Sequence, residues 1–277
     1  MNFKFCEFIR ELSDLSMIPN IKSLDLSSCK NLVEVHDSVG RLDKLETLSL
    51  DDCAKLRILP SCLMMESLRY FSLQRCSSLK KFPNISREMK SLNTLYMTGT
   101  AISELPLSFE NLTELKGLWF GNNLGVVHFL SSIYKLQHIE RLVIYGDVIF
   151  LKDMEIDRQP QCNSNEGFSN VFPSLKSLRL SNFKIRSKID FILTICWSPT
   201  LVSLTVDGSN VVTLPESISR FERLDYLRIE NCNEFRDIPR LPQSIRYVDL
   251  SNCDSLDSSS STKLFHQVSL SLSFKVI

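Results

Sequence analysis

Apolar and polar residues follow each other along this chain in a short phrase that returns about every 23 or 24 residues. Leu45, Leu48 and Leu50 show its apolar positions in one copy, and Cys53 and Leu56 follow at fixed distances. Apolar residues at alternate positions predict a short β-strand with one buried face. A fixed period of this length predicts stacked supersecondary units, so we expect a solenoid with one continuous surface.

The period is read most easily from the last residue of each phrase. The first members are Cys6, Cys29, Cys53, Cys76, Thr100, Asn123 and Asp147. Later copies read LRLSNF, LTVDGS, LRIENC and VDLSNC. The pattern L-x-x-L-x-L-x-x-N/C-x-L resembles that of leucine-rich repeat proteins. The resemblance implies an α/β solenoid, a horseshoe with a concave parallel β-sheet.

The return half of each rung has a second pattern. Pro106 is followed by apolar residues such as Phe109 at spacings of three, and Pro215 is followed by a matching set. Looser copies follow Pro60 and Pro83. Proline suits the first position of a short helix, where its missing N–H is not needed. We therefore expect short helical or 3-10 turns on the convex face, with their apolar side facing the core.

The repeat pattern covers residues 1–256, with about ten full rungs after a truncated first rung. Met1 and Phe3 already occupy strand positions, and no capping unit precedes them. Because a solenoid needs capping units, we expect a fragment or a truncated product of a longer protein. The alternative is a natural start with a frayed half-rung.

Two segments depart from the period. The step between the strand starts at Ile139 and Leu175 is 36 residues, which predicts a polar insertion loop near 151–173. That loop is either a recognition loop or a tolerated insertion. The Ser-rich tail 257–277 contains one candidate strand, in which apolar residues alternate from Val268. It would cap the stack or begin a following domain.

Charge and hydropathy exclude several classes of partner. Lys plus Arg and Asp plus Glu both number 32, so no net field attracts nucleic acid or an anionic membrane. No apolar run approaches the length of a bilayer span, and charged residues interrupt the N-terminal segment where a secretory signal would lie. We expect a soluble protein with no membrane partner, in the cytoplasm or in both nucleus and cytoplasm.

The chain has nine cysteines, and six of them share one position of the repeat. These six are Cys6, Cys29, Cys53, Cys76, Cys232 and Cys253. We expect them to form a column of buried structural thiols inside the turn, since a linear column cannot give tetrahedral metal coordination. Cys62, Cys162 and Cys196 lie off the column.

Nothing in the sequence indicates catalysis. His36, His128, His138 and His266 fall on different rungs and share no partner at a common position. No phosphate-binding G-x-x-x-x-G-K-[ST] or nucleophile G-x-S-x-G motif occurs. We therefore expect no enzyme activity, no cofactor and no metal.

The cysteine-bearing phrases, the GTAISELP rung (Gly99–Pro106) and the closing LPQSI (Leu241–Ile245) are the most distinctive parts of the repeat. Over roughly Met1 to Leu256 they resemble the repeat region of plant intracellular immune receptors. That class carries an N-terminal Toll/interleukin-receptor-like domain and a nucleotide-binding switch domain. The resemblance implies recognition of a pathogen effector protein and restraint of the receptor's own nucleotide-binding domain. No residue of the nucleotide site itself is present here.

Two other readings stay open from the sequence. One is an intracellular scaffold or ubiquitin-ligase adaptor built from similar repeats. The other is an extracellular receptor, but its usual G-x-I-P return segment and paired cysteine caps are missing.

The partner-binding residues follow from the alternation of each strand. With Leu24 and Leu26 pointing inward, Ser23, Asp25 and Ser27 point out of the concave sheet, and the same offsets apply to every rung. Aromatic residues and arginine are enriched at interface hot spots. The outward candidates are Tyr70, Tyr96, Trp119, Arg141, Tyr145, Arg179, Tyr226, Arg228 and Tyr247. Trp119, flanked by Tyr96 and Arg141, is expected to form a contiguous patch.

Overall fold

The computed structural model describes residues 1–121, 127–129, 133, 135–146, 148–150, 172–183, 192–193, 196, 198–256 and 274–275. Its contacts divide the chain into two compact units. The N-terminal unit is Met1–Ile139 with Val148–Cys162, and the C-terminal unit is Glu140–Asp147 with Asn163–Ile277. A single repeat domain over 1–256 remains a prediction. The expected loop near 151–173 lies outside the described residues except for its last two.

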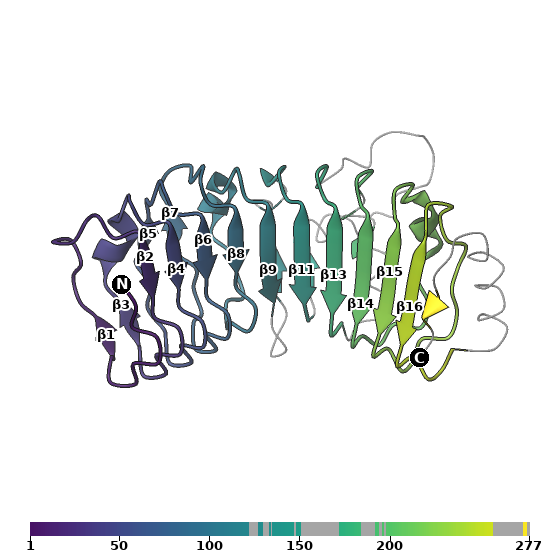
Figure 1. Ribbon diagram of the computed structural model, residues 1–277, viewed down its shortest axis with the longest axis horizontal. Coiled ribbons are helices and arrows are strands. Elements are labelled where there is room, and N and C mark those ends of the chain that lie inside the picture. Colours follow the sequence, from purple (N-terminus) through teal and green to yellow (C-terminus); the bar gives the residue numbers. More distant parts are fainter. Residues whose placement is uncertain are drawn as a thin grey trace. The chain divides into compact units, whose positions relative to one another are not determined.

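Each unit is built around a parallel sheet with one strand for each repeat phrase (Figure 1). In the N-terminal unit the strands pair in the order β2 (Ser23–Asp25), β4 (Thr47–Ser49), β6 (Tyr70–Ser72), β8 (Thr94–Tyr96) and β9 (Gly117–Gly121). In the C-terminal unit the order is β11 (Arg141–Tyr145), β13 (Ser177–Ser181), β14 (Ser203–Asp207), β15 (Tyr226–Glu230), β16 (Tyr247–Ser251) and β17 (Phe274–Lys275). The predicted parallel-sheet solenoid is confirmed.

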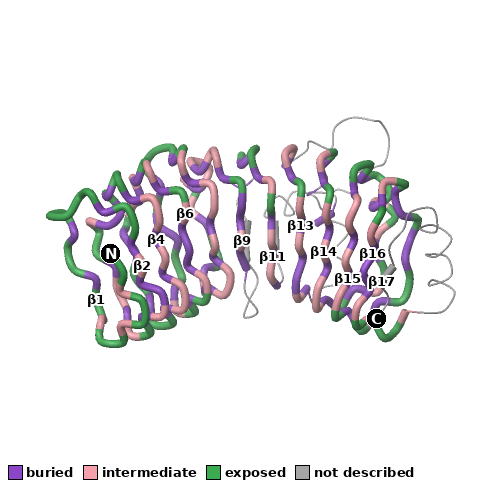
Figure 2. The backbone as a smooth tube through the Cα atoms, viewed as in Figure 1, coloured by how far each residue is buried: buried purple, intermediate pink, exposed green. Residues whose placement is uncertain are grey.

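The core consists of rows of apolar side chains that pair across the strands. Leu24, Leu48, Phe71, Leu95 and Leu118 are register partners in successive strands, and each is at most 1% exposed. Buried positions recur at equivalent points of successive rungs (Figure 2). Burying each such side chain stabilises the fold by roughly 1.5–3 kcal/mol, which is available only when a neighbouring rung covers it.

Each rung turns away from its sheet at one left-handed residue just before the column position. In the N-terminal unit these residues are Phe5 (φ 64°), Ser28 (φ 62°), Asp52 (φ 60°), Arg75 (φ 59°) and Gly99 (φ 76°). The equivalent residues in the C-terminal unit are Gly146, Asn182, Gly208, Asn231 and Asn252. Glycine and asparagine tolerate this conformation best, so most rungs of the C-terminal unit turn with little backbone strain.

Within each unit the cysteines at the column position lie on neighbouring rungs, and five of their thiols donate hydrogen bonds. Cys29, Cys53, Cys76 and Cys232 are buried as predicted, whereas Cys6 and Cys253 are only half-buried. Cys53 Sγ donates to the carbonyl of Leu26 at 3.2 Å, and Cys76 Sγ donates to that of Leu50 at 3.1 Å. Cys29, Cys232 and Cys253 make the same contact with the preceding rung. Burial raises the pKa of the Cys53 thiol to about 12. The column therefore links rungs as neutral thiols, and the described cysteines are free.

The return segments after Pro106 and Pro215 form the expected 3-10 turns, displaced by one position. The turns are η2 (Leu107–Asn111) and η5 (Glu216–Arg220). Each proline occupies the N-cap, with ψ near 150°, instead of the first helical residue. A further turn, η1 (Asp37–Arg41), follows His36.

The expectation of helical turns after Pro60 and Pro83 was wrong. These segments form the two-residue strands β5 (Cys62–Leu63) and β7 (Asn84–Ile85), which pair with each other. Leu63 and Met65 are both buried, and a spacing of two requires extended backbone. Equivalent pairs on the return side are β1 (Glu11–Leu12) with β3 (Glu34–Val35), and β10 (Val127–Phe129) with β12 (Val148–Phe150).

The first phrase follows the strand register but makes only an isolated bridge. Asn2 pairs with Asp25, and the N–H of Phe3 donates to the Asp25 carbonyl at 2.7 Å. Of the tail, the structure describes Phe274–Lys275, which form β17 and pair with β16. The rest of residues 257–277, with most of the candidate strand, lies outside the described residues. Within the described ranges, no helix is long and apolar enough to cross a membrane.

Candidate protein-recognition face

The outward side of each sheet carries the predicted partner-binding residues. We call these surfaces the N-terminal face, on β2 to β9, and the C-terminal face, on β11 to β16. On the N-terminal face the outward residues alternate with the buried core rows, and most of them are partly exposed. Trp119 is half-buried there, whereas Leu118 and Phe120 are at most 2% exposed on the inner side.

Tyr70, Tyr96 and Trp119 come from three successive strands and form an aromatic ladder. The rings of Tyr96 and Trp119 are stacked, with centroids 4.2 Å apart and planes 25° apart. The rings of Tyr70 and Tyr96 are tilted by 49°, with centroids 5.6 Å apart. Such pairs contribute about 0.5–1.5 kcal/mol beyond the area that they bury. The structure therefore brings these three predicted residues together as one preorganised surface.

Gly117 makes room for the Trp119 ring. A Cβ atom at Gly117 would lie 2.5 Å from Trp119 Cζ3 and 2.9 Å from Cη2. The benzo half of the indole thus covers the glycine on its own strand. Sequence reasoning missed Gly117, although a glycine two residues before an outward tryptophan was a readable signal.

Two carboxylates lie on the same N-terminal face. Asp51 accepts hydrogen bonds from the Ser72 hydroxyl and, at 3.1 Å, from the Gln74 N–H. Asp25 accepts one from the Ser27 N–H at 2.9 Å. Burial raises the pKa of Tyr70, and the nearby Asp51 raises it further. Tyr70 is therefore a neutral ring next to negative charge at physiological pH.

On the C-terminal face two of the three predicted arginines, Arg179 and Arg228, are paired with carboxylates of neighbouring strands. Arg179 Nη2 lies 2.6 Å from Asp207 Oδ2 and 3.2 Å from Glu230 Oε1. Arg228 Nε lies 3.0 Å from Asp249 Oδ2. Asp207, Glu230 and Asp249 were not among the predicted residues, although the outward offsets that selected the arginines also select these carboxylates.

The predicted tyrosines of the C-terminal face also stack. The planes of the Tyr226 and Tyr247 rings are nearly parallel, 4° apart, and the ring centroids are separated by 4.7 Å. The guanidinium carbon of Arg228 lies 5.5 Å from the centroid of Tyr226. Arg141 is exposed and Tyr145 is half-buried, at opposite ends of β11. The patch expected around Trp119 included Tyr96 and Arg141. The structure shows the contact between Tyr96 and Trp119. Arg141 belongs to the C-terminal unit.

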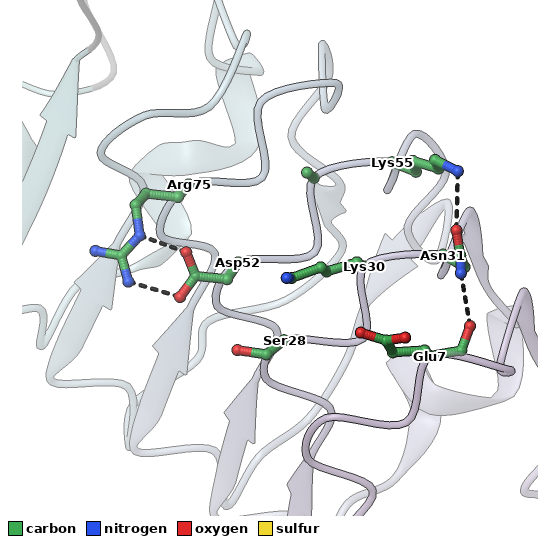
Figure 3. Close-up of a pocket in the computed structure, with 8 residues that line it drawn as sticks. Glu7, Ser28, Lys30, Asn31, Asp52, Lys55 and Arg75 are labelled. Atoms are coloured by element: carbon green, nitrogen blue, oxygen red, sulfur yellow. Dashed lines mark hydrogen bonds and ion pairs between the residues drawn. The ribbon is translucent and has the colours of Figure 1, made fainter.

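A shallow open depression of about 560 Å³ lies at the turn edge of the N-terminal unit (Figure 3). Its lining residues are Glu7, Ser28, Lys30, Asn31, Asp52, Ala54, Lys55 and Arg75. Arg75 Nη2 lies 2.6 Å from Asp52 Oδ2, and Lys55 Nζ donates to Asn31 Oδ1 at 2.8 Å. Because these charges are mixed and largely engaged, the depression offers few free groups to a ligand.

The structure describes the side chains of His36 and His138, which have separate partners. His36 Nδ1 lies 3.9 Å from Asp14 Oδ1, and His138 Nε2 lies 3.9 Å from Glu114 Oε1. His36 is the N-cap residue of η1, and its Nδ1 accepts a hydrogen bond from the Ser38 N–H at 3.2 Å. In the part of the chain that the structure describes, no group of three or more His, Cys, Asp or Glu side chains is placed to hold a metal ion.

Two curated relatives illustrate what the chain is similar to. It is 30% identical over 269 residues to TMV resistance protein N of Nicotiana glutinosa, covering 84% of this chain and 23% of that protein. It is 24% identical over 258 residues to Disease resistance protein RPS4B of Arabidopsis thaliana, covering 92% of this chain and 20% of that protein. The chain therefore spans only about a fifth to a quarter of the length of these relatives.

A solved leucine-rich repeat protein of Leptospira interrogans, LIC12759, has the same fold. It aligns with a TM-score of 0.50 at 16% identity, covering 98% of this chain and 94% of that chain. The family model described as leucine-rich repeats of RPS4B-like disease resistance proteins matches residues 64–270, most of the chain. The resemblance read from the repeat phrases is thus confirmed, and the chain belongs to the leucine-rich repeat family of RPS4B-like disease resistance proteins.

Proposed function

We propose that this chain is the protein-recognition region of a plant disease-resistance receptor and that it binds a pathogen-derived protein. In a longer protein, the same region would also restrain the nucleotide-binding switch domain in the resting state. We place this activity in the cytoplasm, or in both cytoplasm and nucleus. Membership of the RPS4B-like family and the similarity to TMV resistance protein N support the proposal.

The aromatic ladder is the observation that carries the proposal. Tyr70, Tyr96 and Trp119 hold one another in place on the outward side of the sheet while remaining partly exposed. Rigid aromatic side chains lose little conformational entropy on binding and are enriched at hot spots. A solenoid presents such residues from distant parts of the sequence on one surface.

The C-terminal face offers a second proposed contact surface with a different chemistry. Arg141, Tyr145, Arg179, Tyr226 and Arg228 are the residues that we assign to partner binding there. Because Arg179 and Arg228 are already held by carboxylates, their guanidinium groups are oriented before a partner arrives. Preorganisation of this kind lowers the entropic cost of association.

The test is a binding screen of the full chain against a panel of purified secreted pathogen proteins. For any partner found, Trp119→Ala should raise the dissociation constant by about tenfold or more, as truncation of a central hot spot does. Leu107→Ala is the matched control, since Leu107 is 70% exposed on the return side. Its affinity and the thermal transitions of both variants should stay close to wild type.

Arg179→Gln provides the second variant. A charge reversal is unsuitable, because a glutamate at this position would face Asp207 and Glu230. Full affinity in both the Trp119 and Arg179 variants would move the contact surface away from the two faces. Restraint of the switch domain is tested separately, by measuring nucleotide exchange of the receptor's own nucleotide-binding domain with and without this chain.

A further inference from the structure

We propose that the N-terminal face binds an extended protein segment through arginine or lysine side chains, which stack on the aromatic ladder and pair with Asp25 and Asp51. This inference rests on the proposed recognition function and names the chemistry of the partner at that face.

The charge of the N-terminal face supports a cationic partner. Its outward residues are Ser23, Asp25, Ser27, Thr47, Ser49, Asp51, Tyr70, Ser72, Gln74, Thr94, Tyr96, Thr98, Gly117, Trp119 and Gly121. The set contains two carboxylates and no basic side chain. Basic residues occur only at its edges, where Lys22 pairs with Glu46 at 3.4 Å and Arg75 pairs with Asp52. Arg69 and Lys116 lie just before strands β6 and β9.

Tyr70 on β6 is the last ring of the aromatic ladder, and the two carboxylates belong to the next two rungs toward the N-terminus. Tyr96 packs against Tyr70 from the β8 side. On the β4 side the register places Thr47 opposite Tyr70, with Ser49 next on the same face, and both side chains are short. Asp25 is the register partner of Ser49, and Asp51 follows two residues after Ser49. The Asp51 carboxylate leans toward the β6 rung, where Ser72 and Gln74 bind it. A cation lying over Thr47 and Ser49 would therefore meet Tyr70 and Asp51 toward β6 and Asp25 toward β2.

Asp25 and Asp51 have hydrogen bonds but form no direct ion pair with a described residue. Arg75 is near enough for the charge of Asp51 to help raise its pKa, but its guanidinium is bonded to Asp52. The partner of Asp25 is the Ser27 N–H. The partners of Asp51 are the Ser49 hydroxyl at 3.3 Å, the Ser72 hydroxyl and the Gln74 N–H. Among the described residues, no lysine or arginine forms an ion pair with either carboxylate. A ligand cation would gain both Coulomb attraction and a cation–π contact there.

The C-terminal face builds the same arrangement from the chain's own residues. The Arg228 guanidinium lies 5.5 Å from the centroid of Tyr226, and its Nε lies 3.0 Å from Asp249 Oδ2. A tyrosine ring, a carboxylate and a guanidinium are thus compatible on this kind of sheet face. The N-terminal face supplies the ring and the carboxylates and lacks the cation, which leaves that role to a partner.

The test uses a peptide of three Arg-Gly-Ser repeats and the full chain, with binding followed by isothermal titration. In an extended peptide the arginines are about 10 Å apart, which matches roughly two strand spacings of the sheet. The control peptide carries citrulline at each arginine, so that the shape is kept and the charge is removed. We expect the arginine peptide to bind at least about tenfold more tightly, and salt to weaken it.

Variants of the chain locate the contact. Tyr70→Leu should weaken binding about fivefold, whereas Tyr70→Phe, which keeps the ring, should stay within about twofold of wild type. The double variant Asp25→Asn and Asp51→Asn should weaken binding and flatten its salt dependence. Phe8→Leu is the matched control and should bind like wild type, because it removes a ring that is 98% exposed and belongs to neither face. Tyr247→Leu probes the C-terminal face.

The possible results separate this inference from the proposed function. Equal binding of the arginine and citrulline peptides, or no detectable binding of either, overturns the cationic partner. Loss of arginine-peptide binding in Tyr247→Leu but not in Tyr70→Leu overturns the assigned face. If Trp119→Ala still abolishes binding of a protein partner in any of these cases, the proposed recognition function stands. Only the inference that the partner binds through cationic side chains is then wrong.

Discussion

Replacing Gly117 by alanine tests whether the aromatic ladder is held as the structure indicates. The new methyl group would lie 2.5 Å from Trp119 Cζ3, well inside the ordinary contact distance of about 3.4 Å. The indole must therefore move by about 0.9 Å or rotate to another rotamer. Either movement disturbs its stacking on Tyr96, whose ring centroid is now 4.2 Å away.

The expected change in stability is small because two effects oppose each other. Loss of the stacked pair costs about 0.5–1.5 kcal/mol. Alanine also restricts the unfolded chain at a position with an ordinary backbone angle, which stabilises the protein by about 0.4–1 kcal/mol. The free energy of unfolding of Gly117→Ala should therefore lie within about 1 kcal/mol of wild type, a Tm shift of at most about 2–4 °C.

The spectra, in contrast, should change clearly. Near-ultraviolet circular dichroism and tryptophan emission report the packing of Trp119 against Tyr96, and subtracting the spectrum of Trp119→Phe removes the signal of the second tryptophan. We expect Gly117→Ala to lose most of this difference signal and to shift the emission to longer wavelength. Affinity for any partner of the N-terminal face should fall as well.

One result would refute the reasoning about the ladder. If Gly117→Ala keeps the difference spectrum of wild type while remaining folded, the indole does not lie over the glycine. A large loss of stability would also contradict it, because it would mean that Trp119 belongs to the core and not to the face.

Three further predictions concern the column and the turn edge. Burial raises the pKa of the Cys53 thiol to about 12, so at pH 8 Cys53 should react with a thiol reagent far more slowly than the half-buried Cys62. Mass spectrometry after timed labelling measures the two rates. Faster labelling of Cys53 than of Cys62 would mean that the column is accessible to the reagent. At the left-handed position of Arg75, the Arg75→Gly variant should be about 1 kcal/mol more stable in urea than Arg75→Ala, since glycine adopts φ 59° without strain; equal stability would argue against that backbone. The hydrogen bond from Arg75 lowers the pKa of Asp52, so this carboxylate stabilises the folded state above about pH 4 and loses that contribution as pH falls through its folded pKa; the stability difference from Asp52→Asn should vanish in acid, and persistence there would contradict the linkage.

The repeat pattern was enough to predict the strands and the cysteine column. Leu48 and Leu50 alternate with polar residues, and only a strand with one buried face places them together. The constant period then fixes which residues are neighbours across rungs, so Cys53 and Cys76 had to lie in one file. The outward direction of Trp119 followed from the same alternation.

Only the tertiary structure decided which neighbouring segments and side chains contact each other. The segments after Pro60 and Pro83 became strands because each could pair with the other, which no local pattern of either segment reveals. Arg179 was predicted as an outward residue, but its pairing with Asp207 and Glu230 depends on rotamers and on charges brought from two other rungs. The sequence thus determined which way each side chain points, because strand alternation is local. The partner of each side chain depended on what the stacking of rungs brought within reach, because hydrogen bonds and ion pairs act only over a few ångströms.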